Sequence, residues 1–268
     1  MFDALIERGF QVDIHSHARA ILSVDFPQAV AELEETIGSL SIPIEEIVGS
    51  GGGESQGTQR LRRALADRGW EKMNFTVEKR INGVAREAIS HEIDHVKAFS
   101  PGVIAAEIEW NNKDPFYDRD LENFKRLHAD GAISVGVIIT RGTSMQDELK
   151  AMVQRFATER GLNSHEAVTA FGMSRTARQN KEVERRMRAG QSYEEAWASQ
   201  FVSDKYGQAT THWSKLEDRV HRGVGNPCPL VLIGLPSSIV TFDENLQLED
   251  IEREEESLIE EGIADAAD

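Results

Sequence analysis

The sequence predicts an α/β fold in which buried strands alternate with amphipathic helices. Three apolar runs, 103–110, 133–140 and 229–235, have the length and branched side chains of buried strands. Helical spacing follows the first run at 118–129 and the second at 144–156. The order strand, helix, strand, helix, strand is typical of a sheet that helices cover.

The region before the first buried strand is expected to hold two helices joined by a loop. Residues 28–40 have helical spacing directly after Pro27, and residues 58–70 form a second helical pattern. The glycine-rich segment 47–57 lies between them and lacks the Lys-Ser/Thr pair of a phosphate-binding loop, so it is expected to be a surface loop. Arg60 follows this loop and is a candidate DNA contact; the alternative is a solvated basic helix face.

The helices between and after the strands are justified by their apolar spacing. In 118–129 the residues predicted to face inward are Leu121, Phe124 and Leu127. Ser144 and Asp147 can cap the next helix. Residues 158–210 are polar, helical and rich in arginine. The predicted organisation is a core of 1–157 and 211–242, a helical insertion at 158–210 and an acidic C-terminal tail at 243–268.

Composition limits the class of protein. The 268 residues suit one large domain or two small ones, and 40% of them are hydrophobic. No run reaches the roughly 20 apolar residues of a membrane span, and no signal peptide is expected. The single cysteine, Cys228, excludes an intramolecular disulfide and favours a reducing cytoplasm.

The charge distribution leaves room for a nucleic-acid partner. The net charge is −16, but residues 243–268 hold 12 acidic groups and one basic group, a net of −11. The remainder carries 34 acidic and 29 basic groups, a net of −5. The body of the protein can therefore still present a local basic face.

Three carboxylates form the most informative motif. Glu107 and Glu109 are two apart in the predicted strand 103–110, so they share one face of it. The turn signal at residues 100–102 lets Asp94 lie on a neighbouring antiparallel segment. Burying a carboxylate costs free energy unless a metal ion or another partner compensates its charge. Carboxylate oxygens are hard ligands that attract Mg²⁺. The alternative is a chance pattern on an exposed strand.

Two histidine motifs indicate other chemistries. His91, Glu92 and His95 match the HExxH signature of zinc hydrolases, which requires residues 84–98 to form a helix. Asp94 at the fourth position and the turn that follows weigh against this interpretation. His15 and His17 resemble the first-strand motif of metal-dependent amidohydrolases, although too few strand–helix units are present for a barrel.

Three segments together resemble type II restriction endonucleases of the BglII/BstYI kind and, more distantly, BamHI. They are 105–121 (AAEIEWNNKDPFYDRDL), 133–140 (ISVGVIIT) and 223–235 (GVGNPCPLVLIGL). The resemblance covers about 28–157 and 211–242. It implies the restriction-endonuclease-like, PD-(D/E)xK core, a mixed central sheet flanked by helices. Residues 64–70 resemble the helix that ends in tryptophan before the active site of these enzymes.

Carried over residue by residue, the resemblance makes Asp94, Glu107 and Glu109 the catalytic and metal-binding carboxylates. The last position is a lysine in most enzymes of the wider fold, and Glu109 departs from that pattern. A fourth active-site residue is expected about three positions after Trp70, where the chain has Met73, flanked by Glu71 and Asn74. Its assignment stays open.

The implied activity is Mg²⁺-dependent hydrolysis of phosphodiester bonds in double-stranded DNA by a homodimer at a palindromic site. The polar loop that follows the candidate catalytic strand has side chains that can read bases or simply form a turn. Its residues are Asn111, Asn112, Lys113 and Asp114. Arginines of the insertion can bind phosphates or pair with nearby glutamates. A zinc hydrolase, or an inactive DNA-binding protein on the same fold, are the alternatives.

Overall fold

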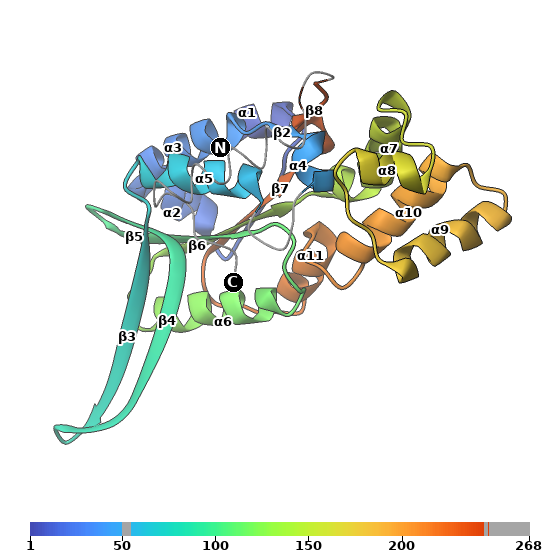
Figure 1. Cartoon of the computed structure of the whole chain (residues 1–268). Coiled ribbons are helices and arrows are strands. Elements are labelled where there is room, and N and C mark those ends of the chain that lie inside the picture. Colours follow the sequence, from blue (N-terminus) through green and yellow to red (C-terminus); the bar gives the residue numbers. More distant parts are fainter. Residues whose placement is uncertain (50–54, 244–245, 247–268) are drawn as a thin grey trace. The chain divides into compact units, whose positions relative to one another are not determined.

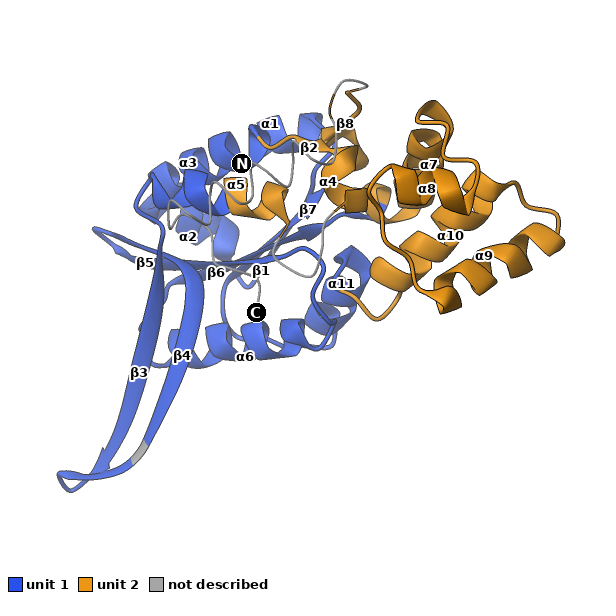
Figure 2. Ribbon diagram, viewed as in Figure 1, with its two compact units in different colours: residues 1–39, 61–143, 211–235 blue, residues 40–60, 144–210, 236–268 orange. Residues whose placement is uncertain are grey.

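The computed structural model describes residues 1–49, 55–243 and 246, and it divides into two compact units (Figure 2). Unit 1 comprises 1–39, 61–143 and 211–235. Unit 2 comprises 40–60, 144–210 and 236–268. The predicted division into core, insertion and tail stays a prediction, and the acidic tail and much of the glycine-rich loop lie outside the described residues.

Unit 1 is built on a six-stranded mixed sheet with the order β1-β7-β6-β5-β4-β3 (Figure 1). Its strands are β1 (Gln11–His15), β3 (Glu71–Ile81), β4 (Val84–Phe99), β5 (Gly102–Glu109), β6 (Val135–Arg141) and β7 (Leu230–Leu235). The central pairs β5–β6 and β6–β7 are parallel, while β1–β7, β4–β5 and β3–β4 are antiparallel. All residues of β6 and β7 are buried, as expected for strands covered on both faces.

Helices cover both faces of this sheet (Figure 1). On one side lie α6 (Phe116–Ala129) and α11 (Trp213–His221), whose Leu121, Phe124 and Leu216 join the buried cluster that includes Leu232. On the other side lie α1 (Asp3–Glu7), α2 (Ala18–Asp25), α3 (Pro27–Gly38) and the C-terminal part of α5 (Gln56–Ala66). The core therefore lies in two apolar layers, one on each face of the sheet.

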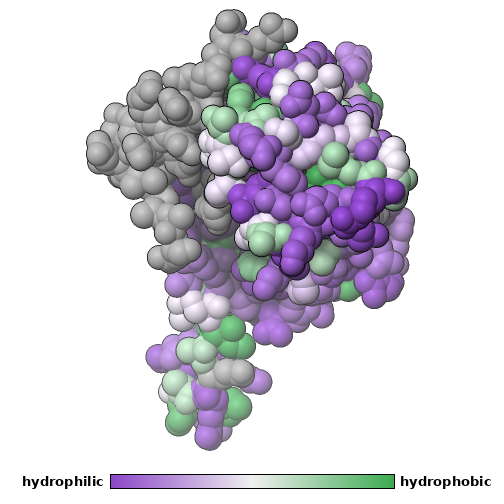
Figure 3. Space-filling view, turned by 45° about the vertical axis from the view of Figure 1, so that its right-hand side comes forward, coloured by the Kyte–Doolittle hydropathy of each residue, from purple (hydrophilic) through white to green (hydrophobic). Residues whose placement is uncertain are grey.

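Strands β3 and β4 form a long hairpin that extends away from the rest of unit 1 (Figure 1). Its turn is Asn82-Gly83, and both residues have positive φ, 52° and 79°. This is the two-residue turn whose twist matches that of the strands, and it favours Asn-Gly. Ile81 and Val84 pair across the strands beside the turn and are about half exposed, which accounts for apolar surface on the projection in Figure 3.

Unit 2 is mainly helical. Its elements are β2 (Ile42–Pro43), α4 (Ile44–Gly49), α7 (Thr143–Glu159, from Ser144 onward), α8 (His165–Ala170), α9 (Ala177–Arg188), α10 (Tyr193–Lys205), η1 (Ser237–Ile239) and β8 (Val240–Thr241). The short strands β2 and β8 pair in parallel. Capping side chains begin three of the helices: Ser164 Oγ accepts from the Ala167 N–H, Thr176 Oγ1 from the Gln179 N–H, and Ser192 Oγ from the Glu195 N–H.

The elements predicted from apolar patterns are confirmed. The strands at 103–110, 133–140 and 229–235 are β5, β6 and β7, and the helices at 118–129 and 144–156 are α6 and α7. The predicted helix of 58–70 ends earlier, because α5 stops at Ala66. Cys228 is buried and free, as expected. No helix of the described part of the chain is long and apolar enough to cross a membrane.

Candidate active site

A β-bulge positions Asp94. The ladder between β3 and β4 changes register between Glu71 and Met73. One residue of β3, Lys72, therefore lies opposite two residues of β4, Asp94 and His95. Bulges redirect side chains and occur often beside active sites. Lys72 Nζ lies 4.0 Å from Asp94 Oδ1, and the Asp94 side chain is about half exposed.

Glu107 and Glu109 lie on the buried central strand β5, as predicted. The register with the parallel strand β6 places Glu107 beside Ile138 and Glu109 beside Thr140. Both glutamates are only 2–3% exposed. Thr140 Oγ1 donates to the Glu109 carbonyl oxygen at 2.7 Å and bonds the Tyr117 hydroxyl at 2.6 Å. This buried chain of hydrogen bonds holds the end of β5 against α6.

A fourth carboxylate, Asp120 of α6, belongs to the same cluster and was not predicted. It is completely buried, and its charge raises the pKa of both Glu107 and Glu109. The signal was present in the sequence: Asp120 lies three residues after Tyr117 and four before Phe124, so it shares the buried face of α6 with them. An aspartate at such a position is costly without a partner.

Burial and mutual repulsion dominate the electrostatics of the cluster, and Arg119 offsets them only in part. Burial, and then the charges of Asp120 and Asp94, raise the pKa of Glu107 well above its usual value. Burial and the charge of Asp120 raise the pKa of Glu109 to about 8. Burial also raises the pKa of Asp120. At neutral pH the cluster consequently holds protons that ordinary carboxyl groups would have released.

Two polar side chains stabilise the cluster at its outer side. Arg119 lies 2.8 Å from Asp120 Oδ1 and 3.7 Å from Glu109 Oε1. The Asn112 side-chain amide donates to Glu109 Oε2 at 2.8 Å. These contacts orient Glu109 and lower its pKa, but burial and Asp120 outweigh them. Glu107 accepts no comparable contact from a described residue.

The donor set fits a divalent cation of the hard type. Asp120 Oδ2 is buried and is reached by no nitrogen or hydroxyl donor among the described residues, while the carboxyl groups of Asp120 and Glu109 lie within hydrogen-bonding reach of each other. Carboxylate oxygens are the protein ligands that Mg²⁺ prefers, and a cation would compensate the charge that now raises the pKa values. No group of three or more His, Cys, Asp or Glu side chains within the described ranges is already arranged as a metal site.

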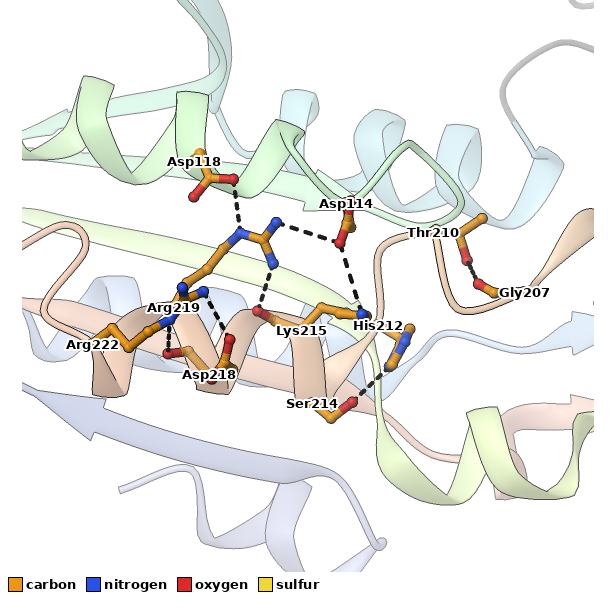
Figure 4. Close-up of polar contacts among 10 residues, drawn as sticks. All are labelled: Asp114, Asp118, Gly207, Thr210, His212, Ser214, Lys215, Asp218, Arg219 and Arg222. Atoms are coloured by element: carbon orange, nitrogen blue, oxygen red, sulfur yellow. Dashed lines mark hydrogen bonds and ion pairs between the residues drawn. The ribbon is translucent and has the colours of Figure 1, made fainter.

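The loop after β5 is tied to the cluster and to α11. Besides the Asn112 contact with Glu109, the Asn112 N–H donates to Thr211 Oγ1 at 3.1 Å. Asp114 lies 3.4 Å from Arg219, which also binds Asp118 at 2.9 Å; Figure 4 shows both carboxylates directed at the guanidinium. Asn112 and Lys113 are exposed, whereas Asn111 and Asp114 are half-buried. The loop therefore has a fixed base, from which Lys113 faces solvent and Asn112 is exposed but keeps its amide on Glu109.

The remaining predicted contacts are dispersed. Arg60, at the end of the unit 2 portion of α5, binds the buried Glu46 at 2.7 Å and the Ser41 carbonyl. Its guanidinium is thus engaged within unit 2, and a role toward DNA stays a prediction. Met73 is exposed on β3, and Asn74 there accepts a hydrogen bond from Ser90. The fourth active-site residue remains unassigned; Lys72 binds Glu92 at 2.8 Å and lies 4.0 Å from Asp94.

The helical zinc motif predicted as an alternative is wrong, because residues 84–99 form strand β4. His91 Nδ1 bonds the Asn123 side-chain oxygen of α6 at 2.8 Å. Burial lowers the pKa of His95 to about 4, so that it stays neutral. The second motif ends on an edge strand of an open sheet, where His15 Nε2 contacts Asp13 Oδ2 at 2.8 Å.

These assignments predict a mild effect for His91→Ala. The variant loses one buried hydrogen bond, which destabilises the fold by about 1–3 kcal/mol, but it removes no carboxylate. Cleavage by the folded variant should remain within about tenfold of wild type, and Asn123→Ala should behave alike because it removes the same bond. Loss of all activity together with loss of bound zinc from folded His91→Ala would contradict the assignment; zinc analysis and single-turnover cleavage measure both.

Unit 1 is a layered α/β/α unit with buried carboxylates on the central strand β5, a site suited to acid–base or metal chemistry. Residues 10–235 match the family model described as restriction endonuclease BglII/BglIII. The chain belongs to this family, and it has the restriction-endonuclease-like fold. It is therefore a DNA-binding, phosphodiester-hydrolysing endonuclease of a restriction system. Comparison with curated proteins finds no matching relative.

Proposed function

We propose that the chain is a Mg²⁺-dependent type II endonuclease that acts as a homodimer on a palindromic duplex site. The observation that carries this proposal is the cluster of Asp94, Glu107, Glu109 and Asp120, in which burial raises the pKa of Glu107, Glu109 and Asp120. The family supplies the reaction class, and the cluster supplies oxygen ligands of the hard type.

Asp94 and Glu107 would hold the metal. Asp94 is partly exposed and reaches solvent, where the phosphate arrives, while Glu107 is buried behind it. When bound, Mg²⁺ supplies Lewis-acid polarisation of the scissile phosphate and acidification of water. Asp120, one of whose oxygens no nitrogen or hydroxyl donor of the described residues reaches, is an additional candidate ligand.

Glu109 is the residue we assign to water. Its pKa of about 8 lies near the operating pH, where a carboxylate can both accept and return a proton. Asn112 fixes one of its oxygens and Arg119 approaches the other, so the carboxyl group is oriented before substrate binds. A second-metal ligand is the other role that Glu109 can take.

Asn112 and Lys113 are the side chains we propose for base recognition. They are exposed on a loop that begins two residues after Glu109 and is anchored by Arg219 through Asp114. Asparagine can bond adenine through two hydrogen bonds, for which Asn112 would exchange its bond to Glu109, and lysine can donate to guanine. Asp114 and Asn111, which are half-buried, then support the loop.

The experiment that tests the function is digestion of plasmid DNA in Mg²⁺. Discrete, reproducible fragments whose ends share one palindromic sequence would support the proposal. A smear of random fragments, or cleavage that persists in EDTA, would contradict the site-specific or the metal-dependent part respectively. Sedimentation of the protein with a duplex that holds one site tests the homodimer, because two strands require two carboxylate clusters.

Ca²⁺ is expected to support specific binding without cleavage. Ca²⁺ takes oxygen ligands at longer distances and with looser geometry than Mg²⁺, so it can neutralise the cluster but positions the attacking water poorly. Band-shift titration with the cognate duplex should show tight binding in Ca²⁺, and parallel gels should show no product. Rapid cleavage in Ca²⁺ alone would be inconsistent with a site that depends on Mg²⁺ geometry.

A further inference from the structure

Helix α9 of unit 2 carries a stripe of positive charge. Its twelve residues, ARQNKEVERRMR, include five basic and two acidic side chains. Four of the basic residues follow one another at spacings of three, four and three, which places them on one face of a helix. They are Arg178, Lys181, Arg185 and Arg188.

The stripe faces away from the interior of unit 2. Val183 is the buried residue of α9, and it lies five residues from both Arg178 and Arg188. At 100° per residue it points to the opposite side of the helix. Arg178 is 83% exposed and Arg185 is 67% exposed, so the cations extend into solvent.

Intramolecular pairing neutralises only part of this charge. Glu182 binds both Arg185 and Arg186, and Arg178 has a single contact of 3.4 Å with Asp204. Lys181 and Arg188 are exposed and make no hydrogen bond or ion pair with another of the described residues. The stripe is therefore only partly compensated, in a chain whose net charge is −16.

We infer that this stripe, defined as Arg178, Lys181, Arg185 and Arg188, binds the phosphate backbone of duplex DNA. The Cα atoms of Arg178 and Arg188 are ten helical rises apart, about 15 Å, along which B-DNA presents roughly nine negative charges. The amides of Gln179 and Asn180, which can read bases, are half-buried off the stripe. The contact is therefore to phosphates and independent of sequence.

The inference rests on DNA as the substrate and assigns unit 2 a role in holding it. Salt dependence provides the test, because each phosphate contact contributes about 0.9 to the slope of log K against log salt. Binding of a random 30-base-pair duplex is measured by fluorescence anisotropy in EDTA between 50 and 200 mM KCl. The variant Lys181→Gln/Arg188→Gln removes two stripe charges without breaking a contact with another described residue.

The double variant is expected to lower the slope by about 2 and to weaken binding roughly tenfold per contact near 0.1 M salt. Arg186→Gln is the control, since it removes a charge from the same helix outside the stripe, at a side chain that is only 27% exposed, and its slope should stay at the wild-type value. Circular dichroism verifies that α9 remains folded. Single-turnover cleavage at saturating enzyme should be unchanged in all variants.

A wild-type slope in the double variant, or an equal loss in Arg186→Gln, would overturn the inference. So would a change in oligomeric state on sedimentation, which would make the stripe a protein interface. If the wild-type protein itself bound no duplex, the proposed function and the stripe would both fail, whereas normal wild-type binding with an unchanged double variant refutes the stripe alone.

Discussion

Replacing Glu107 with glutamine should abolish DNA cleavage. Glu107 is buried at the centre of the cluster, and its oxygens are not held by another described side chain. The amide keeps the shape of the side chain but removes the charge that binds a cation. Loss of several kcal/mol of electrostatic stabilisation lowers the rate by about 10³-fold or more. Asp94→Asn should have the same effect for the same reason.

Binding of DNA by these variants should be retained or tighter, because a negative charge facing the phosphates has been removed. Single-turnover cleavage in Mg²⁺ and band-shift titration measure the two properties separately. Glu122→Gln is the matched control, since Glu122 lies on α6 two residues from Asp120 but pairs with Lys125 and Arg126 at the surface. Cleavage at the wild-type rate by Glu107→Gln would show that the cluster is not the catalytic site.

Without a divalent cation, the folded protein should lose stability as pH rises from 6.5 to 8.5. The folded pKa of Glu109 is raised from 4.5 to about 8. A carboxyl group with a raised folded pKa binds its proton more tightly in the folded state, so its contribution falls as pH rises from the unfolded to the folded pKa. The raised pKa of Glu107 acts in the same direction.

The window starts at pH 6.5 because His95 opposes the effect below it. Burial lowers the pKa of His95 from 6.5 to about 4, and that group adds stability as pH rises through this range. Between pH 6.5 and 8, about 1.4 kcal/mol per pKa unit gives a loss of roughly 2 kcal/mol from Glu109. Acids with lowered pKa, such as Glu32, change protonation only below this window.

Urea unfolding in EDTA at pH 6.5 and 8.5 measures this loss. Glu109→Gln should depend less on pH than wild type across the window, with the remaining dependence due to Glu107, Asp120 and Lys205, and should be more stable than wild type at pH 8.5. Mg²⁺ should stabilise wild type most at the higher pH, where the carboxylates are ionised. Equal pH dependence of wild type and Glu109→Gln would show that Glu109 ionises normally.

The sequence alone determined the central elements of this protein. Strands β5, β6 and β7 and helix α6 were predicted from apolar runs and helical spacing. Burial of both faces of a strand requires a continuous apolar run, and burial of one face of a helix requires apolar residues at helical spacing. Glu107 and Glu109 stand out for the same reason, since they interrupt a run that is otherwise apolar. Their resemblance to a nuclease motif then indicated the family that the match over residues 10–235 shows.

Other features were decided by tertiary structure. Residues 84–98 have apolar spacing that suits a helix, yet pairing with β3 and β5 makes them a strand, because ladder hydrogen bonds between distant residues override a weak local preference. The bulge opposite Lys72, which positions Asp94, exists only in that pairing.

Asp120 joined the cluster only through the packing of α6 on the sheet. The α6 pattern places Asp120 on the buried face but does not say what lies across from it. Local periodicity records which side of an element is buried, whereas the partner on that side depends on contacts between segments far apart in the chain. The central strands and the positions of Glu107 and Glu109 could therefore be predicted from the sequence. The cluster that they form with Asp94 and Asp120 depends on tertiary contacts.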